Sequence, residues 1–242
     1  MAVSHKYKYI FLKVPKTAST AVLNYLQSID EDEDIEEIEN SKEFKHYNGH
    51  IPAYILRKYL GEEIWNSYTK FGVVRNPYTH TMSHYDHQLN TTYDNRDFSD
   101  FRIIFPHNRP DKNYRKSKDN RYILEPKPSG KLYLEGLISL EALLSNWFCM
   151  DSVIYTQSYI LYHNNKDDES ILTIKFENLK KDLIEIFNLI GLDTNFKLPY
   201  KNPVKPWRTT MNRYIVLNDK NFIDHVNLYR DIDFINFNYN KK

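Results

Sequence analysis

One segment near the start of the chain passes from an apolar strand into a helix through a turn without glycine. Residues 7–13 alternate and then become apolar, which predicts a buried strand. Helical spacing follows at 19–27, where Val22, Leu23 and Leu26 share one side. A turn of this kind gathers backbone N–H groups at the positive end of a helix dipole. The segment therefore favours an α/β fold with an anion site at the turn.

Strand and helix patterns alternate along the rest of the chain. The predicted strands are 69–74 and 170–175, and the predicted helices are 51–60, 76–89, 137–162 with a break near Asp151, 178–190 and the tail to Tyr239. Such alternation predicts a P-loop-like parallel sheet flanked by helices, in which ligands bind beyond the carboxyl ends of the strands. We expect a single domain, 1–242, with a long irregular insertion at about 91–136.

Composition restricts the class of protein. With 33 basic and 32 acidic residues the net charge is +1, so bulk charge does not indicate a nucleic-acid partner. The lone cysteine, Cys149, lies in an apolar helical stretch and is interpreted as a core residue. The chain has no run of about 20 apolar residues and no signal-peptide pattern. A cytoplasmic protein without a membrane span is expected, with a lumenal fragment of a longer protein as the alternative.

The turn after the first strand carries residues suited to an anion. Lys16 adds a full positive charge, and Ser19 and Thr20 add hydroxyl groups. A Walker A loop performs the same task but requires glycines, and the first glycine of this chain is Gly49. The alternative is an ordinary turn between a strand and a helix, with a Ser/Thr cap.

A second candidate anion site follows the strand at 69–74. Arg75 stands at the carboxyl end of that strand, next to a helix that Asn76 and Pro77 begin, and Ser83 follows about two turns later. An arginine in this position is suited to clamp a phosphate group. The alternative is an arginine that is paired with a nearby carboxylate.

These two segments, Pro15–Thr20 and Val74–Pro77 followed by Ser83, resemble the two signatures with which sulfotransferases bind 3′-phosphoadenosine 5′-phosphosulfate (PAPS). The resemblance is greatest to the heparan sulfate 2-O-sulfotransferase group of carbohydrate O-sulfotransferases. It covers the first 90 residues, with a weaker echo at 176–179. It implies transfer of a sulfuryl group from PAPS to a hydroxyl, with a sugar hydroxyl favoured. It places Lys16, Thr17, Ala18, Ser19 and Thr20 at the 5′-phosphosulfate, and Arg75 and Ser83 at the 3′-phosphate.

Two further segments are candidates for ligand contacts. In the resembling enzymes a late basic loop closes over the nucleotide, and here Lys205, Trp207 and Arg208 stand in such a loop. The basic stretch from Arg109 to Lys131 has eight Lys/Arg against three acids and suits an acidic glycan acceptor. Both segments are otherwise explained as solvated loops.

Histidine is the natural base for this reaction. Sulfuryl transfer resembles phosphoryl transfer, so it needs a base at the acceptor hydroxyl and a cation at the leaving oxygen. The resembling enzymes carry His-Gly-His between the two signatures, and here His50 matches the second histidine while Asn48 replaces the first. We therefore assign His50 as the base and Lys16 to the leaving group, with no metal. His46, His84 and His87 are the alternative bases.

Two other function classes remain open from the sequence. A P-loop-type nucleotide or small-molecule kinase shares the strand–turn–helix cradle, although the glycines and a Walker B acid are missing. A PAP- or glycan-binding module without catalytic activity is the other, because Asn48 departs from the His-Gly-His pattern. Binding of PAP, the product nucleotide, without metal would separate the sulfotransferase from the kinase.

Overall fold

A computed structural model of the chain describes residues 1–29, 38, 41–47, 49–84, 114–116, 122–124, 156–162, 170–198 and 217–242. The chain forms two compact units. The first comprises residues 1–80, 153–204 and 230–241, and the second comprises 81–152, 205–229 and 242. The first unit contains the sheet, and the expectation of one domain with an insertion at about 91–136 stays a prediction.

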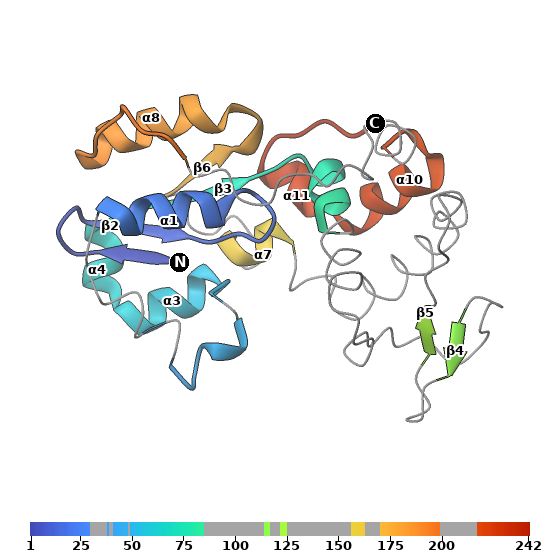
Figure 1. Cartoon of the computed structure of the whole chain (residues 1–242), viewed down its shortest axis with the longest axis horizontal. Coiled ribbons are helices and arrows are strands. Elements are labelled where there is room, and N and C mark those ends of the chain that lie inside the picture. Colours follow the sequence, from blue (N-terminus) through green and yellow to red (C-terminus); the bar gives the residue numbers. More distant parts are fainter. Residues whose placement is uncertain are drawn as a thin grey trace. The chain divides into compact units, whose positions relative to one another are not determined.

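The sheet of the first unit has four strands in the order β1-β2-β3-β6 (Figure 1). Its strands are β1 (Ala2–Ser4), β2 (Tyr9–Leu12), β3 (Thr69–Val74) and β6 (Ile171–Lys175). The strands β2, β3 and β6 are parallel, as the sequence predicts. The sheet is nevertheless mixed, because β1 pairs antiparallel to β2. A strand of three residues is too short to show a periodic pattern, so β1 was not predicted.

Helices and 3-10 turns connect and cover these strands. They are α1 (Ser19–Ile29), η1 (Lys45–Tyr47), α3 (Ala53–Leu60), α4 (Glu62–Ser67), α7 (Gln157–Tyr162), η3 (Phe176–Asn178), α8 (Leu179–Ile190) and α11 (Asp231–Asn236). A further helix begins at Pro77 and is described as far as residue 84. The predicted end of α8 is confirmed, since Gly191 adopts φ 75° at its C-cap.

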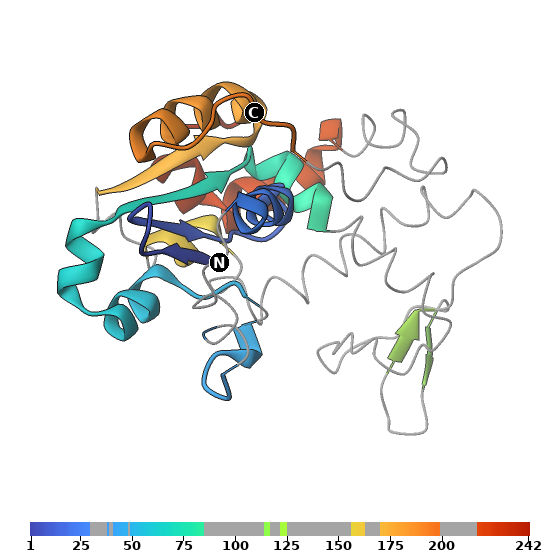
Figure 2. The same ribbon diagram turned by 60° about the vertical axis from the view of Figure 1, so that its left-hand side comes forward.

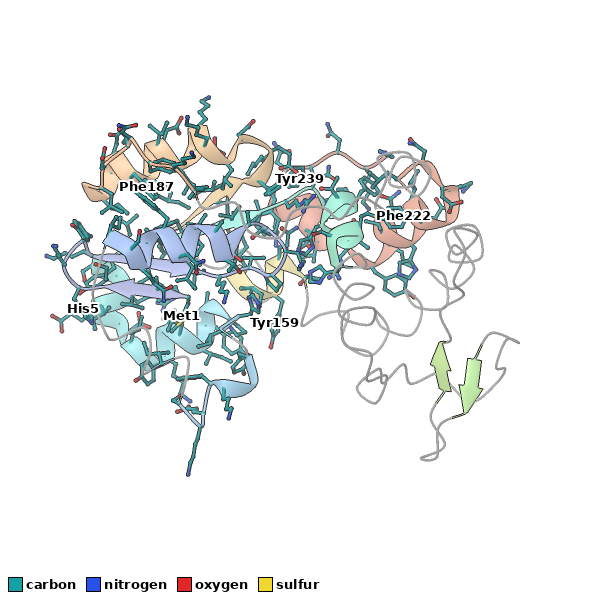
Figure 3. All side chains as sticks on the ribbon, in the orientation of Figure 1. Met1, His5, Tyr159, Phe187, Phe222 and Tyr239 are labelled. Atoms are coloured by element: carbon teal, nitrogen blue, oxygen red, sulfur yellow. The ribbon has the colours of Figure 1, made fainter. Side chains whose placement is uncertain are left out.

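Alternating side chains of the sheet enter two separate cores. In β2, Tyr9 and Phe11 join one buried cluster while Ile10 and Leu12 join the other. The first cluster is completed from α1 and α8, among others by Leu26 and Phe187, and the second from α3, α4 and α7 (Leu56, Trp65 and Leu161). Helices therefore cover both faces of the sheet (Figure 2), and Phe187 of α8 is labelled in Figure 3. This three-layer arrangement is the expected α/β fold.

The second unit is described in part. It contains the antiparallel strands β4 (Tyr114–Lys116) and β5 (Tyr122–Leu124), and helix α10 (Lys220–Tyr229). The strand pair falls in the segment that the sequence presents as irregular, where clustered charge and proline hide the pattern. Cys149 and most of the helix predicted at 137–162 lie outside the described residues. Among the helices that the structure describes, none is long and apolar enough to cross a membrane.

Candidate functional site

The loop between β2 and α1, residues 13–18, has an unusual backbone for a segment without glycine. Lys16 has φ 60° and Ala18 has φ 65°, whereas Thr17 between them is not in the positive-φ region. Alternation of this kind turns successive N–H groups toward one side and forms an anion-binding nest. A left-handed conformation costs an L-residue about 1–2 kcal/mol. Two such residues in one short loop make it a candidate functional segment.

Three buried side chains hold the β2–α1 loop in this conformation. Thr17 Oγ1 and Ser19 Oγ both donate to the carbonyl oxygen of Val14, at 3.0 and 2.5 Å. His80 Nε2 lies 2.8 Å from the carbonyl oxygen of Pro15. Because a carbonyl only accepts, Nε2 carries the proton. The hydroxyls of Thr17 and Ser19 thus fasten the loop, and the exposed Thr20 is the predicted 5′-site hydroxyl that reaches solvent.

His80 is a neutral histidine inside a positively charged region. Burial lowers its pKa to about 3, the Arg230 guanidinium beside it acts in the same direction, and Arg75 and Lys16 add to the effect. The hydrogen bond to Pro15 opposes the shift. A histidine that remains neutral and donates to a loop carbonyl has a structural task, and it is not a base for an acceptor in solvent.

The guanidinium of Arg75 lies beside the β2–α1 loop. Its Nη1 donates to the carbonyl oxygen of Lys16 at 3.3 Å and its Nε donates to Thr79 Oγ1 at 3.0 Å. The guanidinium carbon stands 4.3 Å from the ring centre of Phe176, a cation–π distance. The carboxyl ends of β2 and β3 therefore bring Lys16 and Arg75 together, as expected from a parallel sheet.

The backbone around Arg75 is held from two other elements. The side-chain amide of Gln157 bonds both the N–H and the C=O of Arg75, at 2.6 and 2.8 Å. Glu177 Oε1 accepts from the N–H of Asn76 at 2.9 Å, and its Oε2 accepts from the Tyr239 hydroxyl at 2.7 Å. Tyr239 is labelled in Figure 3. Asn76 Oδ1 in turn accepts from the N–H of residue 78, which confirms the predicted cap of the following helix.

The side chain of His50 contacts Lys13, the first residue of the β2–α1 loop. Its Nδ1 is 2.8 Å from the carbonyl oxygen of Lys13, and its backbone N–H donates to the carbonyl of Tyr47. Since the carbonyl oxygen of Lys13 can only accept a hydrogen bond, Nδ1 carries the proton, and the lone pair of the neutral ring resides on Nε2. This tautomer is the one in which Nε2 can accept a proton.

Tyr47 and Tyr54 lie close in sequence to His50, and Tyr159 of α7 lies beside Tyr54. The hydroxyls of Tyr54 and Tyr159 are 3.3 Å apart, with their rings edge to face, and Tyr159 is labelled in Figure 3. Burial, the hydrogen bond between the Tyr159 and Tyr54 hydroxyls and the charges that Tyr54 and Tyr47 carry when ionised raise the pKa of Tyr159 to about 12. Burial and the neighbouring Tyr54 also raise the pKa of Tyr47. Tyr47 and Tyr159 thus remain protonated at neutral pH and present hydroxyl groups beside rings.

Several residues predicted to bind the nucleotide or to act as the base do not belong to this group of contacts around Lys16 and Arg75. Ser83 is partly buried and His84 is buried on the helix at 77–84, in the part that belongs to the second unit. His84, one of the alternative bases, is therefore largely shielded from solvent. The side chain of His46 and the residues Asn48, His87, Lys205, Trp207, Arg208 and Arg109 lie outside the described residues.

The sequence did not point to His80, Gln157, Glu177 or Asp233. His80 had a usable signal, because it stands one helical turn after Asn76 and so faces the same end of the sheet. Glu177 is the second residue after the last strand, at the edge where Lys16 and Arg75 were expected. Gln157 and Asp233 contact partners 75 or more residues away, and no local pattern marks them.

Comparison with known proteins gives the family. The profile described as the Sulfotransferase family matches residues 1–240. Neither a curated protein nor a solved structure gives a significant match. The match covers almost the whole chain, and it includes both the loop that holds Lys16 and the strand end that holds Arg75. The chain therefore belongs to the sulfotransferase family, and it is an enzyme that transfers sulfuryl groups.

Proposed function

We propose that the enzyme takes its sulfuryl group from PAPS, which it binds through residues 16–20, Arg75 and Ser83. The observation that carries this proposal is the contact between Arg75 and Lys16, with Nη1 3.3 Å from the Lys16 carbonyl oxygen. It places the backbone of Lys16 beside the guanidinium of Arg75 at one edge of the sheet, and the positive charges of both residues act on His80. A ligand with two separate anionic groups, a 5′-phosphosulfate and a 3′-phosphate, suits that pair of cations better than a single phosphate does.

The chemistry of the donor set fits the 5′ end of such a ligand. The first turn of α1 leaves the N–H groups of Ser19 and Thr20 without an acceptor inside the helix, and the nest at Lys16–Ala18 adds further N–H groups. PAPS supplies an activated sulfuryl group bound to its 5′-phosphate. The late basic loop with Lys205, Trp207 and Arg208 is proposed to cover the nucleotide.

His50 is proposed as the general base. The tautomer that Lys13 selects leaves the lone pair on Nε2, so the ring can take the proton of an acceptor hydroxyl. Lys16 is proposed to neutralise the negative charge that grows on the departing phosphate oxygen, since its ammonium belongs to the loop that holds the 5′ end. These assignments need no metal ion.

A carbohydrate hydroxyl is the proposed acceptor. The resemblance to the heparan sulfate 2-O-sulfotransferase group supports it, as does the basic stretch Arg109–Lys131, which suits an acidic glycan. The tyrosines at 47, 54 and 159 add support, because rings with hydroxyl groups contact both the apolar face and the polar edge of a sugar. Asn48 replaces the first histidine of the His-Gly-His motif. The base function is therefore proposed for His50, the histidine that the motif retains.

Ligand-dependent thermal unfolding tests the donor. PAP at about 100 times its dissociation constant should stabilise the fold by about 2.7 kcal/mol without metal, whereas ATP with Mg²⁺ should do so much less. A panel of uronate-containing glycans and simple hydroxyl compounds, assayed with PAPS, then tests the acceptor. Equal or greater stabilisation by ATP with Mg²⁺ would contradict the proposed donor, and sulfation of simple hydroxyls alone would contradict the carbohydrate acceptor.

A further inference from the structure

We propose that Gln157 is a positioning residue for the donor nucleotide, which acts by fixing the backbone of Arg75. This role rests on the proposed function, in which Arg75 holds the 3′-phosphate. Gln157 Oε1 accepts from the N–H of Arg75 at 2.6 Å, and Nε2 donates to its C=O at 2.8 Å. One amide thus bonds both backbone polar groups of a single residue.

The place of this contact explains why an amide is needed there. The pairing of β3 with β2 ends at Gly72, and its pairing with β6 ends at Val74. Arg75 is therefore the first residue beyond the paired part of β3, and there its backbone N–H and C=O bond the side-chain amide of Gln157. Partly buried backbone groups without partners are costly. The amide of Gln157 has the same donor and acceptor as a peptide, and it continues the ladder by one residue.

Asp233 fixes the position of Gln157 through hydrogen bonds to the backbone. The side chain of Gln157 is completely buried, and Gln157 is the first residue of α7. Its backbone N–H donates to Asp233 Oδ2 at 3.2 Å, while the N–H and hydroxyl of Ser158 donate to Asp233 Oδ1 at 2.8 and 2.7 Å. Asp233 is also completely buried. A carboxylate on α11 therefore fixes the first turn of α7, and with it the amide that reaches Arg75.

Helix α7 also packs closely against the strand that leads to Arg75. A Cβ atom at Gly72 would come within 2.8 Å of Leu161 Cδ2 and within 3.2 Å of the carbonyl oxygen of Leu12. The absence of a side chain at this position in β3 lets Leu161 approach. The helix is thus fixed along its length, against β3 through Leu161 and to α11 through Asp233. Gln157 transmits that rigidity to Arg75.

This rigidity bears on one part of the ligand. The guanidinium of Arg75 already contacts the Lys16 carbonyl, Thr79 and the Phe176 ring. A fixed backbone keeps these contacts in place before the nucleotide arrives, so less conformational entropy is lost on binding. The gain applies only to the group that Arg75 binds. Gln157 should therefore affect the affinity for a 3′-phosphate and leave the affinity for the 5′ end unchanged.

Calorimetric titration of the whole chain with PAP and with adenosine 5′-phosphate (AMP), which lacks the 3′-phosphate, measures this selectivity. Gln157→Leu removes both hydrogen bonds to Arg75, so the Kd for PAP should rise about tenfold. The Kd for AMP should stay within about twofold of the wild-type value. In the Arg75→Ala background, Gln157→Leu should cause no further loss of PAP affinity, because the residue through which it acts is gone.

Ser158→Ala is the matched control. Ser158 is the next residue of α7 and equally buried, and the change removes one hydrogen bond to Asp233 but neither bond to Arg75. Its Kd for both nucleotides should stay within about twofold of the wild type. If Gln157→Leu does not fold, Gln157→Asn keeps the amide but is too short to bond both groups, and it should show the same selective loss.

Four results would overturn the proposal. An equal loss of PAP and AMP affinity in the Gln157 variants would show a general structural role, as would an equal loss in Ser158→Ala. An unchanged PAP affinity in a folded Gln157 variant would show that Arg75 needs no positioning. A wild-type chain that binds PAP no better than AMP would instead refute the proposed 3′-phosphate site, and with it the role of Gln157.

Discussion

The Nδ1 atom of His50 lies 2.8 Å from the carbonyl oxygen of Lys13, the residue with which the β2–α1 loop begins. The base proposed for the acceptor is thus tied to the segment that is proposed to hold the donor. Any shift of the loop changes the orientation of the imidazole, and the carbonyl selects the tautomer whose Nε2 accepts a proton. One hydrogen bond therefore sets both the position and the protonation pattern of the ring.

Replacement of His50 tests its role as the base. His50→Ala should fold and bind PAP as the wild type does, yet lose about 10²–10⁴-fold in turnover. Wild-type activity should fall on acidification, because an imidazolium cannot accept the acceptor's proton, and the residual activity of the variant should lack that fall. Steady-state rates over a pH series, with PAP affinity measured in parallel, provide the check.

His50→Gln separates chemistry from position. A glutamine amide can still donate to the Lys13 carbonyl, but it has no basic nitrogen, so it should lose as much turnover as the alanine variant. Recovery of activity with glutamine would mean that His50 only positions the loop. Activity of His50→Ala within about threefold of the wild type would move the base to His46, His84 or His87.

The two cations at the sheet edge should have different kinetic signatures. Arg75→Ala should mainly raise the KM for PAPS, because a 3′-phosphate has the same charge in the ground state and the transition state. Lys16→Ala should mainly lower kcat, because negative charge grows on the leaving oxygen only during transfer. Initial rates at varied PAPS concentration distinguish the two effects. If both variants changed only the KM for PAPS, Lys16 would have no part in the chemical step.

The left-handed backbone at Ala18 should be visible in stability. Ala18→Gly removes the cost of φ 65° in an L-residue and should raise the free energy of unfolding by about 0.5–1 kcal/mol. Ala21→Gly is the matched control, because it makes the same change inside α1 and should lower the free energy of unfolding by about 0.5–1 kcal/mol. Urea unfolding measures both. A loss of similar size in both variants would contradict the left-handed conformation at Ala18.

The sequence predicts those strands and helices whose apolar residues follow a local periodic pattern. The apolar runs of β2, β3 and β6 and the helical spacing of α1 and α8 are local patterns, so their bounds were close to the observed ones. The meeting of Lys16 with Arg75 also follows from topology, because the carboxyl ends of parallel strands share one edge. A contact between residues 59 positions apart was therefore predictable.

The supporting residues were not predictable in the same way. Gln157 and Asp233 are polar residues in segments whose apolar neighbours dominate the pattern, and their contacts join α7 to β3 and to α11 across 75 or more residues. The φ angles of Lys16 and Ala18 contradict the local preference of L-residues, and a tertiary contact, the hydrogen bond of His80 to the Pro15 carbonyl, helps to hold them. Long-range hydrogen bonds thus account for the part of the site that the sequence missed.

His80 should make the stability of the fold depend on pH. Its folded pKa of about 3 lies below the ordinary histidine value of 6.5, so the unfolded chain takes up this proton first as the pH falls. The contribution of the neutral ring is therefore complete above about pH 6.5 and is lost progressively toward about pH 3. Over the two pH units from 7 to 5 the loss should reach about 2 kcal/mol of unfolding free energy.

His80→Gln provides the test, because a glutamine amide can donate to the Pro15 carbonyl in place of Nε2 and does not titrate. Urea unfolding of both proteins at pH 7, 6 and 5 gives the comparison. Repacking around the new side chain changes the stability of the variant at pH 7, so the informative quantity is the slope of the unfolding free energy with pH. The wild type should lose about 2 kcal/mol more than the variant between pH 7 and pH 5. Parallel slopes would mean that His80 takes up its proton equally well in the folded chain, and that the ring does not lie buried between Arg230, Arg75 and Lys16.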